Sequence, residues 1–264
     1  MERKNVPKGN YKNPPIPTGY RYLKGNWEKG YVIQRTTDDS QFVWIPVGFL
    51  KSNGTLDGVS FKEKFGRRIC SLEDEFSDEG FNEPINQELK EQIESIIKYG
   101  GFYYSRYNIS ISSKGLLQSR KGFLPYTDLI WDEAKELASA FEHNEFVKSH
   151  LTYGAEYDSV LQWLVDSCEK SFFEIAGDSS SWGNFETYEI KETGSYKKFC
   201  ANKIYDIAGN VAEFTQELNS DYGFCTVRGG NCNEEGTFSA AFREVLSISE
   251  KSKYIGFRIS LWIR

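Results

Sequence analysis

The segment from Arg228 to Glu244, RGGNCNEEGTFSAAFRE, holds the densest group of residues that could do chemistry. Glu234 and Glu235 form an adjacent acidic pair, and carboxyl groups can serve as general acid and general base. Neighbouring side chains on an extended chain point in opposite directions, so this pair is not expected to act on one substrate. Ser239 could be a nucleophile, but no histidine lies near it in the sequence to act as its base. The segment alone therefore predicts no reaction.

Other reactive residue types are too few or too scattered for a familiar catalytic centre. The five cysteines form no C-x-x-C pair, which argues against a disulfide scaffold and against a zinc site. Most of them are expected to be buried thiols that pack as small apolar residues. The two histidines, His143 and His150, are expected to be exposed or to lie at helix ends. The chain has no G-x-S-x-G, no H-E-x-x-H and no phosphate-binding loop motif.

Composition limits the class of protein. A chain of 264 residues can bury a large core, and 16% aromatic residues with 23 glycines favour a loop-rich α+β fold over a helical bundle. The net charge of −6, with no basic stripe in the sequence, argues against nucleic acid as a partner. The sequence contains no apolar run of about 18 residues and no secretory signal. We therefore expect synthesis in the cytoplasm and no membrane insertion.

Residue patterns predict the elements that position this segment. Residues 1–19 are rich in Pro, Lys, Asn and Gly and predict an extended arm, and no linker follows, so residues 20–264 form one domain. The predicted loops include 52–60, the acidic stretch 71–80 and most of the chain between 171 and 200. Alternating apolar residues predict strands within 19–34, 41–50, 101–112, 224–230 and 255–264.

Three helices are expected. Residues 84–101 place Ile85, Leu89, Ile93 and Ile97 at helical spacing before a glycine cap at Gly100. A second helix begins near Trp131, with acidic residues in its first turn. The third spans 153–170, and its apolar face comprises Tyr157, Leu161, Leu164 and Cys168.

A series of short motifs then points to a known family. The motifs GGFYYSRYNIS, LIWDEAKELA and SHLTYGAEYDSVLQWL precede IYDIAGNVAEFTQE, VRGGN, FRE and IGFRISL in the C-terminal half. In this order they resemble the formylglycine-generating enzyme family, the sulfatase-modifying factors, over roughly residues 95–264. The resemblance implies an irregular, loop-rich α+β domain of the C-type lectin-like fold, in the variant found in that family.

The resemblance does not carry the family's chemistry with it. Its copper-dependent oxidases hold copper(I) with two cysteines five residues apart, and the matching positions here are Glu234 and Ser239. Cys232 lies two residues too early. A second branch needs about three histidines around iron, and this chain has two in all. We therefore expect no enzyme of either type, and neither copper nor iron.

The motif DIAGNVAE matches a calcium-binding turn of the family. Carboxylate and carbonyl oxygens are the ligands that calcium prefers. The resemblance thus implies a structural calcium ion, and the alternative is a glycine turn whose polar side chains satisfy backbone groups. The implied ligands are Asp206, Gly209, Val211 and Glu213.

What remains is a binding function. Arg228, Arg243 and Arg258 are expected to be structural residues that pin loops by hydrogen bonds to backbone carbonyls. Between such fixed ends a loop can vary without disturbing the core, as in non-catalytic relatives such as the variable proteins of diversity-generating retroelements. That analogy makes the loop a contact surface for a protein or glycan receptor on a cell. The predicted contact residues are Asn231, Asn233, Glu234, Glu235, Thr237, Phe238, Ser239 and Ala241.

Two other hypotheses stay open. One is an enzyme with an unrecognised site in the same cleft. The other is a structural component of a phage or another assembly, which would form homo-oligomers through its N-terminal region and be associated with the virion.

Overall fold

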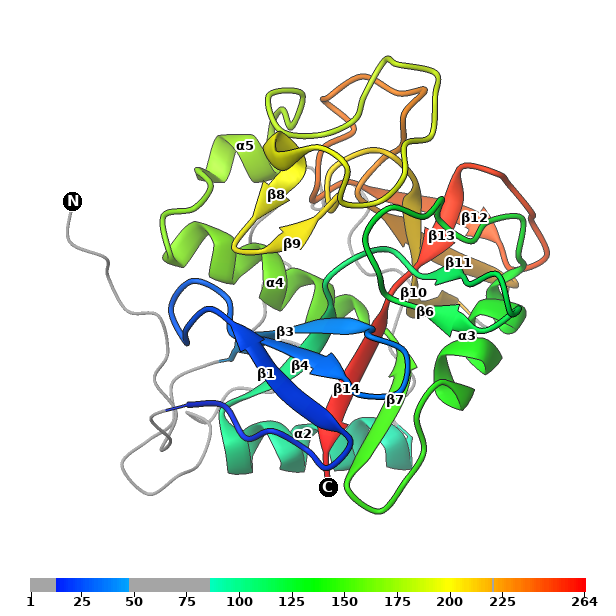
Figure 1. Ribbon diagram of the computed structural model, residues 1–264. Helices are drawn as coiled ribbons and strands as arrows, with labels where there is room; N and C mark the ends of the chain where they lie inside the picture. The colour runs from blue at the N-terminus through cyan, green and yellow to red at the C-terminus, as the bar shows by residue number, and fades with distance from the viewer. Residues whose placement is uncertain (1–12, 48–85, 220) are drawn as a thin grey trace.

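The computed structural model describes residues 13–47, 86–219 and 221–264. Strands predominate, with a few helices packed around them, so the predicted α+β class is confirmed (Figure 1). The larger sheet has six strands in the order β1-β2-β3-β4-β14-β7, and every neighbouring pair is antiparallel. Its strands are β1 (Tyr20–Lys24), β2 (Val32–Arg35), β3 (Gln41–Pro46), β4 (Gly101–Ser105), β7 (Val147–Leu151) and β14 (Ile259–Ile263).

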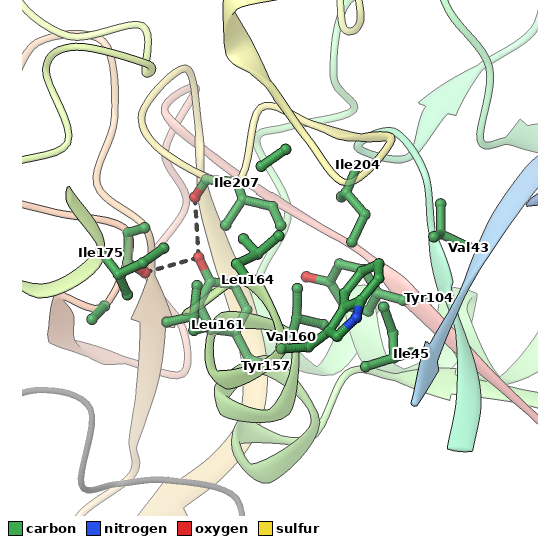
Figure 2. Packing of buried hydrophobic residues seen from close by; sticks show 14 of the residues in the cluster. Val43, Ile45, Tyr104, Tyr157, Val160, Leu161, Leu164, Ile175, Ile204 and Ile207 are labelled. Carbon is green, nitrogen blue, oxygen red and sulfur yellow. Dashed lines mark hydrogen bonds between the residues drawn. The ribbon is translucent and has the colours of Figure 1, made fainter. Parts of the chain in front are cut away.

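Apart from the edge strand β1, whose residues 21–24 are exposed, the six-stranded sheet is buried on both faces because its side chains alternate between two cores. In β3, Val43 and Ile45 face one core while Phe42 and Trp44 face the other. The first core also contains the helix α4 (Gly154–Asp166), and the second contains α3 (Trp131–Ala140). Figure 2 shows the first core, where the α4 side chains meet those of β3 and β4. The alternation in β3 confirms the strand predicted within 41–50.

A second sheet carries the C-terminal loops. It has four strands in the order β12-β11-β10-β13, with β10 parallel to β13 and the other pairs antiparallel. The longest strand, β10, begins at the end of the DIAGNVAE turn motif and continues beyond it, where no strand was predicted. The strands of this sheet are β10 (Ala212–Asn219), β11 (Phe224–Arg228), β12 (Arg243–Ser247) and β13 (Ile255–Phe257).

The predicted helices form, with one different end. Helix α2 (Gln87–Tyr99) ends where expected, at Gly100, whose φ of 80° suits glycine and whose N–H donates to the carbonyl of Ile96. Helix α3 begins at Trp131 as predicted. Helix α4 stops at Asp166, short of the predicted 170, and Cys168 follows with a φ of 56°. Cys168 is therefore exposed, and its predicted place on the buried helical face was wrong.

Two predicted strands each divide into two. The segment 101–112 leaves the large sheet after Ser105, where the ring of Tyr107 stacks on that of Tyr205. Strand pairing resumes in the hairpin of β5 (Ser110–Ile111) and β6 (Leu117–Gln118). The segment 255–264 passes from the small sheet in β13 to the large sheet in β14, and Arg258 lies at the crossing. The remaining elements are α5 (Phe172–Ala176), the short helix Lys197–Phe199, β8 (Cys200–Ala201) and β9 (Ile204–Tyr205).

Part of the N-terminal arm is docked. The hydroxyl of Tyr103 donates to the carbonyl of Pro15 (2.8 Å), and Pro14 and Pro17 are buried. Residues 1–12 and the predicted loops 52–60 and 71–80 lie outside the described residues. In the part of the chain that is described, none of the helices is long and apolar enough to span a bilayer.

Candidate functional site: a loop surface on a charged base

The segment that opened the sequence analysis connects β11 to β12. Its ends meet directly, since Arg228 and Arg243 are paired in the register of the two strands. The chain turns at Gly229 and Gly230, whose φ values are 90° and 65°. Residues other than glycine rarely adopt such positive φ values. Residues 229–242 therefore form a loop with a fixed entry and exit.

A buried cluster of charges holds those ends. The guanidinium of Arg228 donates to Asp158 Oδ1 (2.5 Å) and lies 3.4 Å from Glu217 Oε2. Arg243 pairs with the other carboxylate oxygen of Glu217. Arg228 also donates to the carbonyl of Ala241 (3.2 Å), so it pins the loop as predicted, but its carboxylate partners were not foreseen.

A second loop, residues 177–190, lies against the first. Backbone N–H groups of Ser179 and Thr187 donate to the carbonyls of Gly236 (2.8 Å) and Cys232 (3.0 Å). Figure 1 shows the two loops side by side at the top of the molecule. On the core side, the hydroxyl of Tyr157 donates to the carbonyls of Ile207 and Ala240, both at 3.1 Å (Figure 2). Helix α4 thus holds the first loop through Ala240, and the first loop in turn holds the second.

Gly230 gives a direct test of this packing. A Cβ at Gly230 would lie 2.2 Å from the carbonyl oxygen of Phe238, while a Cβ at Gly115, where φ is 74°, meets nothing within 4 Å. Gly115→Ala isolates the cost of a positive φ, about 1 kcal/mol, and Gly230→Ala adds the steric clash, for a total of about 3 kcal/mol. Denaturant unfolding of the two variants measures both. The same Cβ would lie 3.0 Å from the ring of Phe185 in the second loop, so equal losses would show that Gly230 is not packed against Phe238 and Phe185 in solution.

The eight predicted contact residues do not all reach the surface. Glu235, Thr237 and Phe238 are exposed, and Asn233 and Glu234 are half-buried. Asn231, Ser239 and Ala241 are buried, so their prediction as contact residues needs correction. Asn231 is turned inward because its side-chain oxygen accepts from the N–H of Asn233 (3.0 Å). Ala241 is covered by α5, where its N–H donates to the carbonyl of Ile175 (3.0 Å).

Loop 177–190 contributes surface residues that were not predicted from the sequence. No spacing pattern linked that loop to residue 230, and the one local signal was its polar, aperiodic composition. We call the combined set the loop surface. Its exposed residues are Ser180, Ser181, Glu186, Thr187, Tyr188, Glu189, Glu235, Thr237 and Phe238.

Glu234 is the most perturbed group at this surface. Its carboxylate accepts from the N–H of Asn231 (2.7 Å). Burial, with a smaller contribution from the nearby charge of Glu244, raises the pKa of Glu234 to about 7. A carboxyl in this state can exchange a proton near neutral pH.

This shift predicts a pH-dependent stability. The pKa of this carboxyl is about 4.5 in the unfolded chain and about 7 in the folded chain. Its contribution to stability is therefore fully present below pH 4.5 and is lost as the pH rises through about 7. Between pH 5 and 8, the free energy of unfolding should fall by about 1 kcal/mol more in the native chain than in Glu234→Gln. Solvent still reaches the side chain, which keeps the effect this small. Parallel pH profiles of the two proteins would contradict the assignment.

The residues that match a calcium turn are occupied by other contacts. Glu213 is buried, and Oε1 accepts from Arg258 Nε (2.7 Å) and from Asn108 (2.8 Å). Its Oε2 accepts from the hydroxyl of Tyr104 (3.1 Å). Asp206 Oδ2 accepts from the hydroxyl of Thr193 and the N–H of Gly194, both at 2.8 Å.

These contacts fit a calcium ion poorly. Gly209 has a φ of 68° and Val211 is buried, as a tight turn requires, but the charge opposite Glu213 is a guanidinium. Burial raises the pKa of Glu213 although Arg258 acts in the other direction. Within the described residues, no three His, Cys, Asp or Glu side chains are grouped to hold a metal ion. Structural calcium stays a prediction from the resemblance.

The two histidines differ. His143 is exposed as expected, but His150 is fully buried in β7, which corrects its prediction as an exposed or helix-end residue. Its Nε2 lies 2.9 and 2.8 Å from the two carboxylate oxygens of Glu156, and Gln92 of α2 donates to the same carboxylate. The sequence motif carried no sign of this contact because the partners lie in different elements. Among the described cysteines, Cys225 and Cys232 are buried while Cys168 and Cys200 are not.

Comparison with known proteins supports the fold alone. No family model and no curated protein matches this chain. The structure of PvdO from Pseudomonas aeruginosa is similar with a TM-score of 0.52 and 15% sequence identity, over 88% of this chain and 98% of that one. This chain thus shares a mixed α+β architecture with proteins of the C-type lectin-like fold.

Two further structures are similar at lower scores. CarF matches with a TM-score of 0.46 and 15% identity, over 62% of this chain and 87% of that one. Treponema denticola variable protein 1 matches with a TM-score of 0.47 and 11% identity, over 88% of this chain and 98% of that one.

Proposed function

We propose that this chain is a non-catalytic binding protein whose loop surface contacts a protein or glycan receptor on a cell. The observation that carries the proposal is the arrangement of residues 231–241. Buried Asn231, Ser239 and Ala241 hold the loop from within, while Glu235, Thr237 and Phe238 project outward between them. A rigid base that presents mixed polar and aromatic side chains is how recognition surfaces are commonly built.

The second loop strengthens this proposal. Tyr188 is 73% exposed, yet its N–H donates to the carbonyl of Cys232 (3.0 Å), so its ring is presented from a fixed backbone. Exposed aromatic rings lose little conformational entropy on binding, which makes Tyr188 and Phe238 the expected anchors. In its finer form, the proposal identifies the chain as a phage-encoded or retroelement variable protein associated with the virion. A reverse-transcriptase gene and a near-copy of the 3′ end beside the coding sequence would support that form.

The test compares variants in which only exposed residues change. Substituting all of 231–241 would disturb the buried Ser239 and Ala241, so we choose Glu235→Ala/Thr237→Ala/Phe238→Ala. Binding to panels of intact bacterial cells and immobilised glycans should weaken by about 30-fold, because one central aromatic residue of an interface commonly contributes about 2 kcal/mol. The matched control is Thr37→Ala/Glu94→Ala/Leu116→Ala, which alters three exposed residues elsewhere.

The outcomes separate the functions. Saturable binding that the control keeps and the first variant loses supports a receptor-binding surface. Equal binding by both variants would contradict it and would favour a structural protein that assembles through its N-terminal region.

One observation favours an enzyme as the second candidate. Glu234 occupies the place of a copper-binding cysteine in the family it resembles, and its pKa of about 7 suits a general acid or base. If the chain is such an enzyme, any turnover found for it should be abolished by Glu234→Gln, while ligand binding persists. Turnover that survives this substitution would remove Glu234 from consideration.

A further inference from the structure

A group of four cations gathers away from the loop surface, on a chain whose net charge is −6. Lys24 ends β1, Arg106 follows β4, Lys121 follows β6, and Lys203 lies in the β8–β9 hairpin. We call these four residues the basic cluster. Figure 1 shows β8 and β9 between the large sheet and the loops at the top.

The backbone brings these segments into contact. Arg106 Nε donates to the carbonyl of Lys203 (2.9 Å), and a Cβ at Gly25 would lie 3.0 Å from Lys203 Cε. On the other side, a Cβ at Gly194 would lie 2.5 Å from the ring of Tyr107 and 3.2 Å from Lys121 Cγ. Four segments far apart in the sequence therefore place their positive charges together.

No carboxylate neutralises this cluster within the described parts of the chain. Arg106 is 4% exposed, yet it donates only to neutral oxygens, the Lys203 carbonyl and Gln41 Oε1 (2.5 Å). Its guanidinium lies 5.1 Å from the ring centroid of Tyr107 and 5.4 Å from that of Tyr205. The other buried arginines near the core, Arg228, Arg243 and Arg258, all pair with carboxylates.

The charges repel one another. Partial burial, followed by the charges of Arg106 and Lys203, lowers the pKa of Lys24. Glu169 approaches the β8–β9 turn, where it accepts from the N–H of Asn202 (3.2 Å), but it pairs with no member of the cluster in the described structure. A bound anion would relieve this repulsion, as anions do at other concentrations of fixed positive charge.

We infer that the basic cluster is a binding site for a compact oxyanion, a phosphate or sulfate ester group. Lys24 and Lys121 are exposed and Lys203 is half-exposed, so three flexible ammonium groups can turn toward one anion while buried Arg106 supplies a fixed charge behind them. The ligand is compact because four cations on an acidic chain cannot follow a long polyanion, which the remaining surface would repel. This site is independent of the loop surface and of the function proposed for it.

Calorimetric titration of the full chain at low salt tests the inference with two probes, inorganic pyrophosphate and a sulfated tetrasaccharide. The variant Lys24→Gln/Lys121→Gln should bind about 100-fold more weakly, because it loses two charge-assisted hydrogen bonds and each is worth about tenfold in affinity. The control Lys90→Gln/Lys114→Gln changes the net charge equally at two exposed lysines elsewhere and should bind as the native chain does. Unfolding curves of all three proteins should coincide.

The probes also separate the sources of the oxyanion. Binding of pyrophosphate alone indicates a phosphate ligand, whereas preference for the tetrasaccharide indicates a sulfated saccharide. The inference is overturned if neither probe binds the native chain, if both variants bind equally, or if duplex DNA binds more tightly than either probe.

Discussion

Replacing Arg258 by methionine should lower the free energy of unfolding by about 3 kcal/mol or more, because it leaves the buried carboxylate of Glu213 without its counter-charge. Arg258 Nε lies 2.7 Å from Glu213 Oε1, and both side chains are at most 2% exposed. The same guanidinium donates to the carbonyls of Ser105 (3.0 Å) and Tyr205 (2.5 Å). It therefore joins the large sheet, the small sheet and the β8–β9 hairpin.

Denaturant unfolding of Arg258→Met, Glu213→Gln and the double variant measures the coupling. Each single change leaves a buried group without its partner, so the double variant should lose less than the sum of the two. The exposed pair Arg21–Asp39 is the control, since Arg21→Met should cost less than about 1 kcal/mol. A loss that small for Arg258→Met would mean that the crossing between the sheets does not depend on this pair.

The second large effect is expected at Arg228. Arg228→Met removes the cation that faces Asp158 and Glu217, each of which is at most 2% exposed. We expect a loss of about 3 to 5 kcal/mol, with the loop 229–242 released as well, because Arg228 also holds the carbonyl of Ala241. Because this loop forms part of the loop surface, Arg228→Met should also weaken receptor binding.

Two measurements separate these consequences. Unfolding curves give the stability, and limited proteolysis should cut the variant within 229–242 under conditions in which the native chain resists. Arg21→Met again serves as the control, because its partner is exposed. Protease resistance equal to that of the native loop would show that Arg228 stabilises the core without positioning the loop.

Elements with regular apolar spacing were predictable from the sequence. Helix α2 follows from an amphipathic run closed by Gly100, and β3 follows from a short apolar run around Trp44. Strand β10 could not be predicted because most of its buried positions are polar. Glu213 and Glu217 are inside since arginines 45 and 11 residues away neutralise them, and no local pattern reveals such partners.

The candidate site was predictable only in part. The loop ends at Arg228 and Arg243 were correctly taken as fixed points, and Glu235, Thr237 and Phe238 are exposed as a contact surface requires. Small residues such as Ser239 and Ala241 suit either the surface or the interior, so their burial became visible only with α5 in place. The contribution of Tyr188 depends on backbone hydrogen bonds between loops that are distant in the sequence, and such bonds cannot be predicted from composition.

The most direct test of the central claim is a footprint of the bound receptor. Amide hydrogen exchange of the full chain would be measured with and without the cell-surface ligand that the binding panel identifies. If the loop surface binds the receptor, we expect slower exchange confined to residues 186–189 and 233–238, with the core strands unchanged. Protection that falls instead on the N-terminal arm around residues 13–19, with none in the two loops, would contradict a receptor-binding loop surface.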